Sequence, residues 1–229
     1  MVDGLENLVS MPVRYANWLA PEIIEVALER GEYAFVPGEC TLIYNDDNES
    51  RPYSIASGCE DELLRFVVVM MGDGVLTQWM AKLHPGATVR VSSPYGYFRP
   101  GQEGGEDEQS VFVATGVGIA PFLSFVRSAR PVNLPICFYG VRYAHDILAV
   151  DELREKTDLH VAVSREEIQG THHGRVTELL SGLEIMPNMH FYLCGLDAMV
   201  DQVAYWLAEQ GVEHERVHTE VFFSSDEEG

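Results

Sequence analysis

Lysine, long apolar runs and paired cysteines are what this 229-residue sequence has least of. Lys82 and Lys156 are its only lysines, so arginine supplies 13 of the 15 basic residues. The 36 acidic residues give a formal charge of −21, which disfavours nucleic acids and anionic membrane surfaces as partners. This composition fits a protein that works in high salt, where screening removes self-repulsion, and equally an ordinary acidic protein.

No apolar run approaches the roughly 20 residues that a membrane-spanning helix needs. The first ten residues lack the basic-then-apolar order of a signal peptide, so we expect a cytoplasmic protein. The cysteines form no C-x-x-C pair, which indicates neither a zinc site nor a cysteine-ligated iron–sulfur cluster, and we expect no bound metal; they stand at Cys40, Cys59, Cys137 and Cys194.

The first half of the chain reads as a small all-β domain. Short apolar segments alternate with turn residues, which predicts an antiparallel barrel or sandwich. The expected strands are Val13–Leu19, Ile23–Leu28, Glu39–Tyr44, Arg51–Ser57, Leu63–Met70 and Thr88–Ser92. One helix is expected over Gln78–Leu83, with Thr77 as its N-cap and Pro85-Gly86 closing it.

The second half reads as an α/β domain with a doubly wound parallel sheet. Residues 101–109 contain glycine and acid but no apolar side chain, so we place the domain boundary there, between residues 1–104 and 105–229. Beyond it, strands and helices alternate. The expected strands are Val111–Ala114, Ile136–Tyr139, Leu159–Val163 and Phe191–Cys194, and the expected helices are Pro121–Ala129, Ala149–Lys156, Val176–Leu183 and Ala198–Gln210.

A glycine turn joins the first of these strands to its helix and is a candidate anion site. Thr115-Gly116-Val117-Gly118 is followed by an apolar segment in which Pro121 suits the first helical turn. Bare amides and the positive end of the helix dipole would converge there, and the glycines would let a phosphate approach the backbone. A turn that binds nothing explains the pattern equally well.

Two stretches of the first half add candidate contacts. The strand Arg51-Pro52-Tyr53-Ser54 leads to Ser57 and places a cationic fork beside a flat aromatic ring, which could hold a diphosphate and stack on a planar ring system. The turn Gly74-Val75-Leu76-Thr77 opens the expected helix and is a second possible phosphate site. Taken singly, each is as well explained by an ordinary surface strand and a capped helix.

Taken together and in this order, these motifs resemble the ferredoxin–NADP reductase superfamily of flavoproteins. The resemblance runs from about Phe35-Val36-Pro37-Gly38-Glu39 to Phe223. It implies that Arg51 pairs with the flavin pyrophosphate, Tyr53 stacks on the flavin and Ser54 bonds its reactive nitrogen. It implies further that Gly74–Thr77 hold the flavin phosphates and that the glycine loop receives the nicotinamide nucleotide.

The resemblance extends to the end of the chain. The segment 192–199 is similar to the family's CGxxxM segment, which implies that Cys194 and Gly195 lie near the nicotinamide. Thr219–Phe223 resembles the plant-type ending, which implies that Glu220 is the active-site acid and that Phe222 covers the flavin. Six residues follow here where the plant-type chain stops, so Phe223 is a rival for that role. The family's loop threonine is replaced by Val117, and we expect altered nicotinamide positioning.

Charge argues for NADPH over NADH. The ribose 2′-phosphate that separates them requires cationic partners. Arg142, the pair Ser164-Arg165 and Arg175 lie at or near the carboxyl ends of expected parallel strands, where such sheets bind ligands. The segments around these arginines also resemble bacterial NADP-dependent members of the family, in which arginines at these places contact the 2′-phosphate. The segments are GVRYAxD, VSRE and GRV.

The resemblance therefore implies an FAD- and NADP-dependent oxidoreductase that moves hydride between nicotinamide and flavin, and single electrons to a ferredoxin, a flavodoxin or an oxygenase component. A non-catalytic subunit of the same fold is the alternative, disfavoured by the joint presence of Ser54, Cys194 and Glu220. An unrelated Rossmann dehydrogenase is disfavoured because Pro121 occupies the place of the third glycine of G-x-G-x-x-G.

Overall fold

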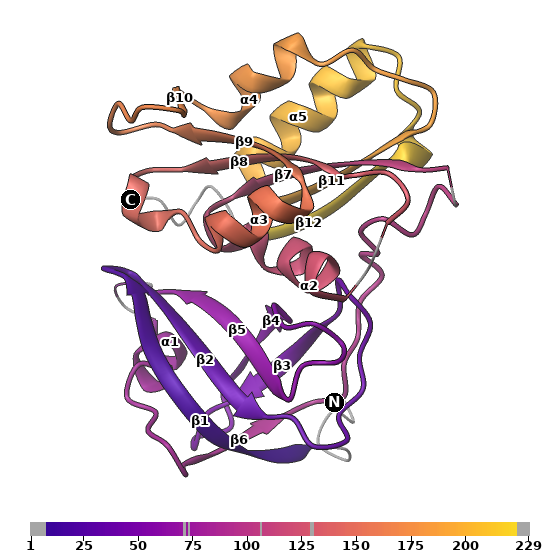
Figure 1. The fold of residues 1–229 in the computed structure, drawn as a ribbon. Helices are drawn as coiled ribbons and strands as arrows, with labels where there is room; N and C mark the ends of the chain where they lie inside the picture. The colour runs from indigo at the N-terminus through magenta and orange to yellow at the C-terminus, as the bar shows by residue number, and fades with distance from the viewer. Residues whose placement is uncertain (1–7, 71, 73, 106, 129–130, 224–229) are drawn as a thin grey trace.

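The structure is a computed structural model that describes residues 8–70, 72, 74–105, 107–128 and 131–223, the last three of them by their backbone alone. Two sheets lie one above the other (Figure 1), and the chain completes the first before it enters the second. Among the described residues, no helix has the length and apolar character that a membrane crossing demands.

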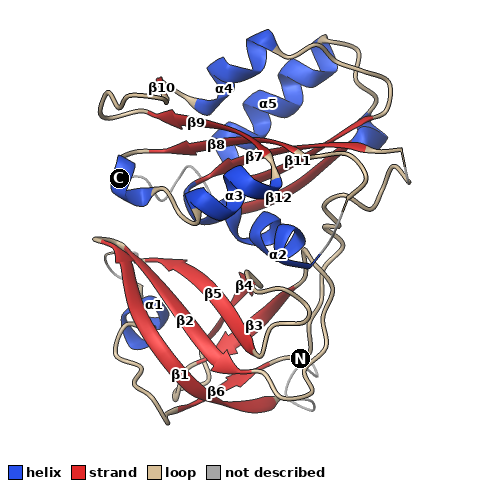
Figure 2. Cartoon of the chain, viewed as in Figure 1, coloured by secondary structure: helices blue, strands red, loops and turns tan. Residues whose placement is uncertain are grey.

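The first sheet is a six-stranded antiparallel sheet, as the spacing predicts. Its order is β4-β3-β6-β1-β2-β5. The strands are β1 (Val9–Ala20), β2 (Ile23–Glu29), β3 (Cys40–Tyr44), β4 (Ser50–Ser54), β5 (Leu63–Val69) and β6 (Thr88–Val91). Figure 2 shows them curled around a shared interior, where side chains such as Ile24, Ile43 and Phe66 are fully buried.

The strand expected over Arg51–Ser57 ends three residues early, at Ser54. The Ile55 amide still bonds to the β3 side, at the Glu39 carbonyl oxygen (3.0 Å), but the Ala56 amide donates to the Arg65 carbonyl oxygen of β5 at 2.9 Å. The chain therefore changes partner strand just after β4. This change links the two end strands of the sheet and closes it into a barrel.

The helix of the barrel domain begins earlier than predicted. Helix α1 spans Val75–Met80, with Gly74 as the residue before it, so the N-cap prediction for Thr77 is wrong. The Thr77 hydroxyl instead donates to the Gly74 carbonyl oxygen at 3.0 Å. A threonine in the first turn satisfies its hydroxyl by bonding back to the preceding turn, which the sequence pattern does not distinguish from a cap.

The second sheet is parallel throughout its described pairs, in the order β10-β9-β8-β7-β11-β12. Its strands are β7 (Gln109–Thr115), β8 (Ile136–Val141), β9 (Asp158–Val163), β10 (His172–His173), β11 (Met189–Leu196) and β12 (Val217–Phe223). The four predicted strands are confirmed, and β10 and β12 extend the sheet at its two edges. This is the predicted doubly wound domain.

Helices cover both faces of the parallel sheet (Figures 1 and 2). Helices α2 and α3 lie on the face toward the barrel, and α4 and α5 lie on the outer face. They span Ala120–Ser128, Val150–Lys156, Val176–Leu179 and Asp197–Glu209. The last helix matches the predicted Ala198–Gln210 to within one residue at each end, and Gly211 just past it adopts φ +79°, as a helix C-terminus favours.

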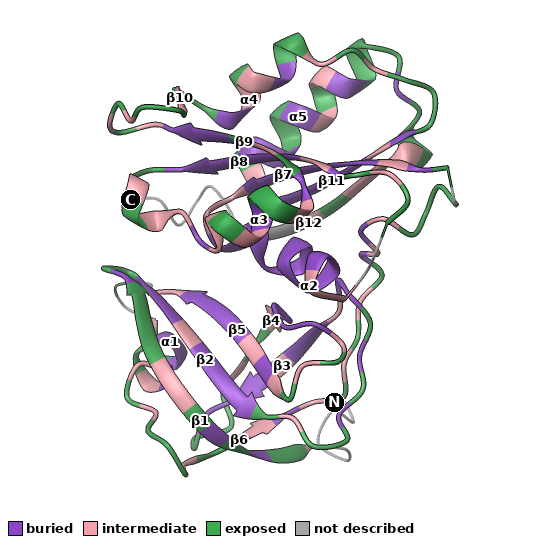
Figure 3. Cartoon of the chain, in the orientation of Figure 1, coloured by how far each residue is buried: buried purple, intermediate pink, exposed green. Residues whose placement is uncertain are grey.

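The two domains share a hydrophobic core. Ala56, Val67 and Phe98 of the barrel side pack in one buried cluster with Phe112 of β7 and Phe122 of α2. Figure 3 shows α2 as mostly buried, in keeping with its place between the sheets. Because apolar burial is the main favourable term in folding, this shared core holds the α2 face of the parallel sheet against the barrel.

Candidate active site at the junction of the two sheets

The order of the parallel sheet reverses between β7 and β11. From β7 the chain continues to β8 and β9 on one side, and it returns to place β11 and then β12 on the other. Ligands of open α/β sheets bind outside the carboxyl ends of the strands at such a switch point. Here those ends are Thr115 on β7 and Leu196 on β11.

The glycine turn lies at this point, with different roles for its two glycines. Residues Gly116–Ile119 form a 3₁₀ turn that leads into α2. Gly116 has φ +53°, and an added Cβ would meet nothing within 4 Å, so its backbone faces open space. A Cβ on Gly118 would instead collide with the backbone of Cys194 and Gly195. Gly118 therefore permits close packing onto β11, while Gly116 fits the predicted approach of a phosphate.

The ends of β7 and β11 are tied together by one side chain. The Thr115 hydroxyl accepts a hydrogen bond from the Leu196 amide at 3.0 Å. Gly195, at φ +138°, leaves no room for a Cβ against that same hydroxyl. The end of β11, where α5 begins, is thus held against the end of β7, which leads into the glycine turn. Val117 of that turn and Pro121 of α2 are buried.

Ser54 and Glu220 meet across the boundary between the sheets. Ser54 ends β4 and Glu220 lies in β12, yet the Ser54 hydroxyl donates to Glu220 Oε1 at 3.2 Å. Glu220 also stands level with Cys194 of β11 in the parallel register. The structure therefore brings together the three residues predicted as catalytic, from three separate strands.

The Glu220 carboxyl group is set up to hold a proton near neutral pH. Burial raises its pKa from the ordinary 4.5 to about 7, and the hydrogen bond from Ser54 opposes this rise only in part. Glu220 Oε2 is buried and finds no partner among the described residues. A buried polar atom that lacks a partner among the described residues fits a site that a bound ligand completes.

This raised pKa predicts how stability depends on pH. The folded chain holds the Glu220 proton more tightly than the unfolded chain, so the stabilisation present below pH 4.5 is lost as the pH rises through about 7. We compare the free energy of unfolding of Glu220→Gln with that of the wild type. We expect this difference to favour the variant by roughly 2 kcal/mol more at pH 8 than at pH 5. Urea unfolding of the flavin-free proteins measures this difference.

Glu213→Gln, which alters an exposed acid shortly before β12, is the matched control and should show no such pH dependence. An equal effect of Glu220→Gln at both pH values would show that the carboxyl is not held in its neutral form.

The Cys194 thiol is fully buried, and burial together with the Glu220 charge raises its pKa well above the usual value. It therefore stays protonated and contributes shape and packing rather than a thiolate. Cys40 is a neighbour that the sequence does not single out. It pairs with Ser54 across β3 and β4 and forms a β-bridge with Tyr95. Burial raises the pKa of its thiol, and the Glu220 charge adds to this rise.

The predicted flavin-strand residues divide into outward and inward groups. Arg51 and Pro52 are exposed, and Tyr53 is half-buried with its pKa raised to about 12 by burial. Ser57 points away from this group: it is fully buried, and its hydroxyl accepts a hydrogen bond from the Arg65 amide at 3.2 Å. The structure thus groups Arg51, Tyr53 and Ser54 on one short strand and separates Ser57 from them.

The second predicted phosphate turn lies at the start of α1. Val75 is exposed, Gly74 is half-buried, and Leu76 and Thr77 face the barrel core. No side-chain cap bonds the first amides of this helix among the described residues. Backbone amides, rather than the Thr77 hydroxyl, are therefore what this turn offers to a ligand.

The three predicted arginines follow three neighbouring strands. Arg142 comes after β8 and Arg165 after β9, and the Arg165 amide donates to the Arg142 carbonyl oxygen at 3.0 Å. Arg175 follows β10 and precedes α4. All three are exposed at the carboxyl edge of the sheet. Ser164 directly precedes Arg165, and its hydroxyl donates to the carbonyl oxygen of Val141, the residue before Arg142, at 3.3 Å.

The last predicted residue, Phe222, has a side chain outside the described part of the structure. Its backbone lies in β12, where the register with β11 passes from Val221 to Phe223 and skips Phe222. Within the described residues, no group of three histidine, cysteine or acidic side chains is suited to a metal ion.

Comparisons with known proteins agree with this geometry. The family model of the oxidoreductase FAD-binding domain matches residues 14–99, and that of the oxidoreductase NAD-binding domain matches residues 112–204. Ferredoxin–NADP reductase B of Sorangium cellulosum is 31% identical, over 88% of this chain and 92% of the relative. The chain belongs to the ferredoxin–NADP reductase superfamily. The predicted resemblance is thereby confirmed.

Two further members show the range of this superfamily. The reductase component of the naphthalene 1,2-dioxygenase system of Pseudomonas putida is 24% identical, over 83% of this chain and 61% of the relative. A ferredoxin NADP⁺ reductase from Neisseria gonorrhoeae, solved with FAD and NADP, has the same fold, with a TM-score of 0.82 at 21% identity over 95% of this chain and 99% of that one. The chain is an NAD(P)H-dependent flavoprotein oxidoreductase with an FAD-binding and an NAD-binding domain.

Proposed function

We propose that this reductase oxidises NADPH and passes the electrons, by way of FAD, to a one-electron acceptor protein such as ferredoxin or flavodoxin. The observation that carries the proposal is the hydrogen bond between Ser54, in the flavin motif, and Glu220, which lies in β12 level with Cys194 of β11. Residues 1–104 would hold the flavin and residues 105–229 the nicotinamide nucleotide. We assign the protein to the cytoplasm, as its composition predicts.

The residues proposed to hold FAD lie on the barrel. Arg51 is exposed and donates from Nη1 to the Ser50 carbonyl oxygen at 2.9 Å, and it would pair with the pyrophosphate. Tyr53 would stack on the flavin ring, and the amides of Gly74–Thr77 would bind the phosphates. When bound, FAD accepts a hydride from the nicotinamide and releases electrons singly. The protein supplies orientation and proton control.

Proton control would fall to Glu220 and Ser54. A carboxyl whose pKa is about 7 exchanges its proton readily at neutral pH, and the matching of pKa to working pH is what general acid–base catalysis requires. The Ser54 hydroxyl both donates and accepts, so it can relay a proton between Glu220 and a ligand on the barrel. The neutral Cys194 thiol beside them would shape the nicotinamide site.

The preference for NADPH would rest on Arg142, Arg165 and Arg175. Their three strands are adjacent, so their side chains share one edge of the sheet, in a domain whose other charges are mainly acidic. A phosphate monoester with two negative charges would find complementary charge there. The ribose 2′-phosphate is the group of NADPH that NADH lacks.

A reductase component of an oxygenase system is the second candidate function. The similarity to the Pseudomonas putida relative favours it. The two functions share the NADPH and flavin steps and differ in the protein that receives the electrons. Reduction of ferredoxin, flavodoxin and an oxygenase component in parallel assays, each at the same NADPH concentration, distinguishes them by their kcat/KM values.

The formal charge of −21 predicts an unusual salt dependence for an acidic acceptor. Two acidic proteins repel each other at low ionic strength, and screening removes this barrier. We expect the second-order rate of ferredoxin reduction to rise at least threefold between 20 mM and 0.5 M salt. An uncharged quinone acceptor is the control and should show no such rise. A ferredoxin rate that falls with salt would instead indicate a local basic docking patch.

A further inference from the structure

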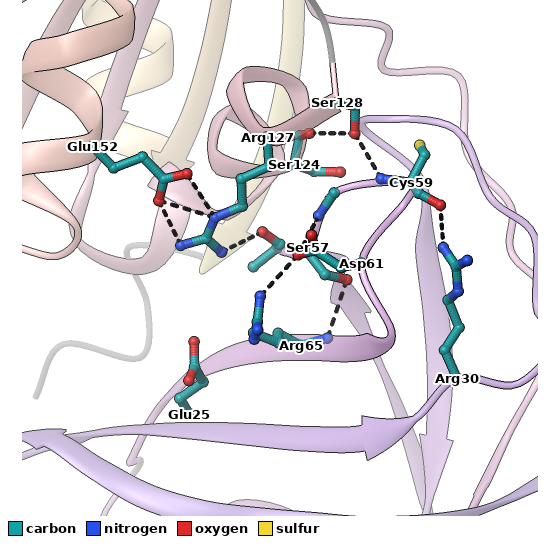
Figure 4. A network of polar contacts seen from close by, with 12 residues as sticks. Glu25, Arg30, Ser57, Cys59, Asp61, Arg65, Ser124, Arg127, Ser128 and Glu152 are labelled. Atoms are coloured by element: carbon teal, nitrogen blue, oxygen red, sulfur yellow. Dashed lines mark hydrogen bonds and ion pairs between the residues drawn. The ribbon is translucent and has the colours of Figure 1, made fainter.

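One arginine joins the barrel to the parallel-sheet domain. Arg127, in the last turn of α2, donates from Nη1 to the carbonyl oxygen of Ala56 at 2.7 Å. Its Nε and Nη2 donate to the Glu152 carboxylate of α3, the shortest of these bonds being 2.8 Å (Figure 4). The guanidinium is therefore bound at once to a loop of one domain and to a carboxylate of the other.

The neighbouring residue repeats this connection. The Ser128 hydroxyl accepts a hydrogen bond from the Cys59 amide at 2.8 Å and donates to the Ser124 carbonyl oxygen at 2.7 Å. A Cβ placed on Gly58 would lie 3.0 Å from both the Cβ and the carbonyl oxygen of Arg127, so loop and helix are in tight contact. We call this set, comprising Arg127, Ser128, Glu152 and residues 56–59, the interdomain clasp.

The clasp joins two segments, each of which is continuous in sequence with one of the proposed cofactor sites. Its loop begins two residues after Ser54, the last residue of the flavin strand. Its helix, α2, starts directly after the glycine turn Gly116–Ile119 of the nucleotide site. A shift of the loop relative to the last turn of α2 therefore moves the flavin strand relative to the glycine turn.

We propose that the interdomain clasp sets the separation between the flavin site and the nicotinamide site, and that Arg127 and Ser128 are positioning residues for hydride transfer. The proposal rests on the proposed function for its chemistry, although the clasp is a feature of the protein alone. Arginine is suited to this place because its planar fork presents several fixed donors, whereas a lysine ammonium is a point charge. Small errors of alignment between reacting groups slow reactions steeply.

The first test uses the full chain without flavin. Hydrogen–deuterium exchange should show at least tenfold faster exchange of the Cys59 amide in both Arg127→Ala and Ser128→Ala. Amides of β8 and β9 should exchange as in the wild type. Arg154→Ala, which removes an exposed arginine of α3, is the matched control and should leave the exchange of the Cys59 amide unchanged.

The second test uses the flavin-loaded enzyme. Flavin reduction by saturating NADPH should slow about tenfold in Arg127→Ala, while the dissociation constants of FAD and NADPH stay within twofold of the wild type. The charge-transfer absorbance between flavin and nicotinamide should weaken in parallel. Arg127→Lys keeps a positive charge beside Glu152 but loses the bond to the Ala56 carbonyl oxygen. It should therefore melt near the wild-type temperature, while its flavin is reduced several-fold more slowly.

The positioning role would be refuted if Arg127→Lys and Ser128→Ala were reduced at the wild-type rate. It would also be refuted if the variants melted at a lower temperature but kept the wild-type rates and charge-transfer absorbance. In either case the clasp would be a structural contact alone. If Arg127→Ala does not fold, Ser128→Ala and Arg127→Lys carry the same test. A wild type that NADPH does not reduce would refute the proposed function, whereas the exchange of the Cys59 amide in the flavin-free chain would still decide whether the clasp exists.

Discussion

We expect Ser54→Ala to leave the protein yellow and to slow the reduction of its flavin by NADPH about 10²-fold. The substitution removes the hydroxyl that bonds Glu220 Oε1. The other carboxylate oxygen, Oε2, already lacks a partner among the described residues. Loss of one preorganised donor or proton relay at a reacting centre typically costs 10² to 10³ in rate. Binding is spared because the proposed flavin contacts of Arg51, Tyr53 and Gly74–Thr77 are unchanged.

Anaerobic stopped-flow absorbance at the flavin band measures this rate. Ser50→Ala is the matched control, because Ser50 lies at the other end of β4, away from Glu220. A Ser54→Ala protein that is reduced at the wild-type rate would mean that the hydroxyl takes no part in the reaction or that nucleotide binding limits it. A colourless variant would assign Ser54 to flavin binding instead.

Replacing both Arg165 and Arg175 with alanine raises the dissociation constant of NADPH about 10³-fold and that of NADH less than threefold. A hydrogen bond between charged partners contributes about 1.5–3 kcal/mol, so two of them together span a factor of roughly 10² to 10⁴. NADH lacks the phosphate and has no such contact to lose. Both arginines are exposed, so folding is unaffected.

Titration of the flavin spectrum with NADP⁺ and NAD⁺, and of the reduction rate with the reduced forms, gives these constants. Arg154→Ala removes a comparable exposed charge from α3 and should change neither nucleotide's binding. Equal losses for the two nucleotides would remove the 2′-phosphate from the Arg165–Arg175 edge of the sheet.

Local pattern in the sequence was enough to predict most of the fold. Short apolar segments separated by turn residues predict the barrel strands, and apolar runs alternating with helical patterns predict the parallel sheet. The errors lie where particular hydrogen bonds decide, one of them non-local and one local. Arg51–Ser57 ends at Ser54 because Ala56 turns to bond β5, and Thr77 is not a cap because its hydroxyl bonds back to Gly74.

The site was predictable to a different degree. Motif order identified Ser54, Cys194 and Glu220, and the structure brings them together from β4, β11 and β12. Nothing in the sequence spacing reports that Cys40 stands beside Ser54, since that contact depends on the pairing of β3 with β4. Arg127 carries no motif either, because its partners Ala56 and Glu152 lie in other elements.

The burial of Glu220 is likewise invisible in the sequence. Its raised pKa arises from removal from water by two sheets that meet only in the folded chain. The same meeting places the Ser54 hydroxyl on one carboxylate oxygen and leaves the other without a partner among the described residues. The chemistry of the site is thus a property of the junction between domains.

Anaerobic mixing of the purified protein with NADPH and, separately, with NADH tests the central claim most directly. We predict a yellow protein whose flavin is bleached by NADPH at least tenfold more efficiently than by NADH, in low and in molar salt. A flavin that neither nucleotide reduces would contradict the assignment of the site. A flavin that both reduce equally would keep the hydride step and refute the proposed specificity for NADPH.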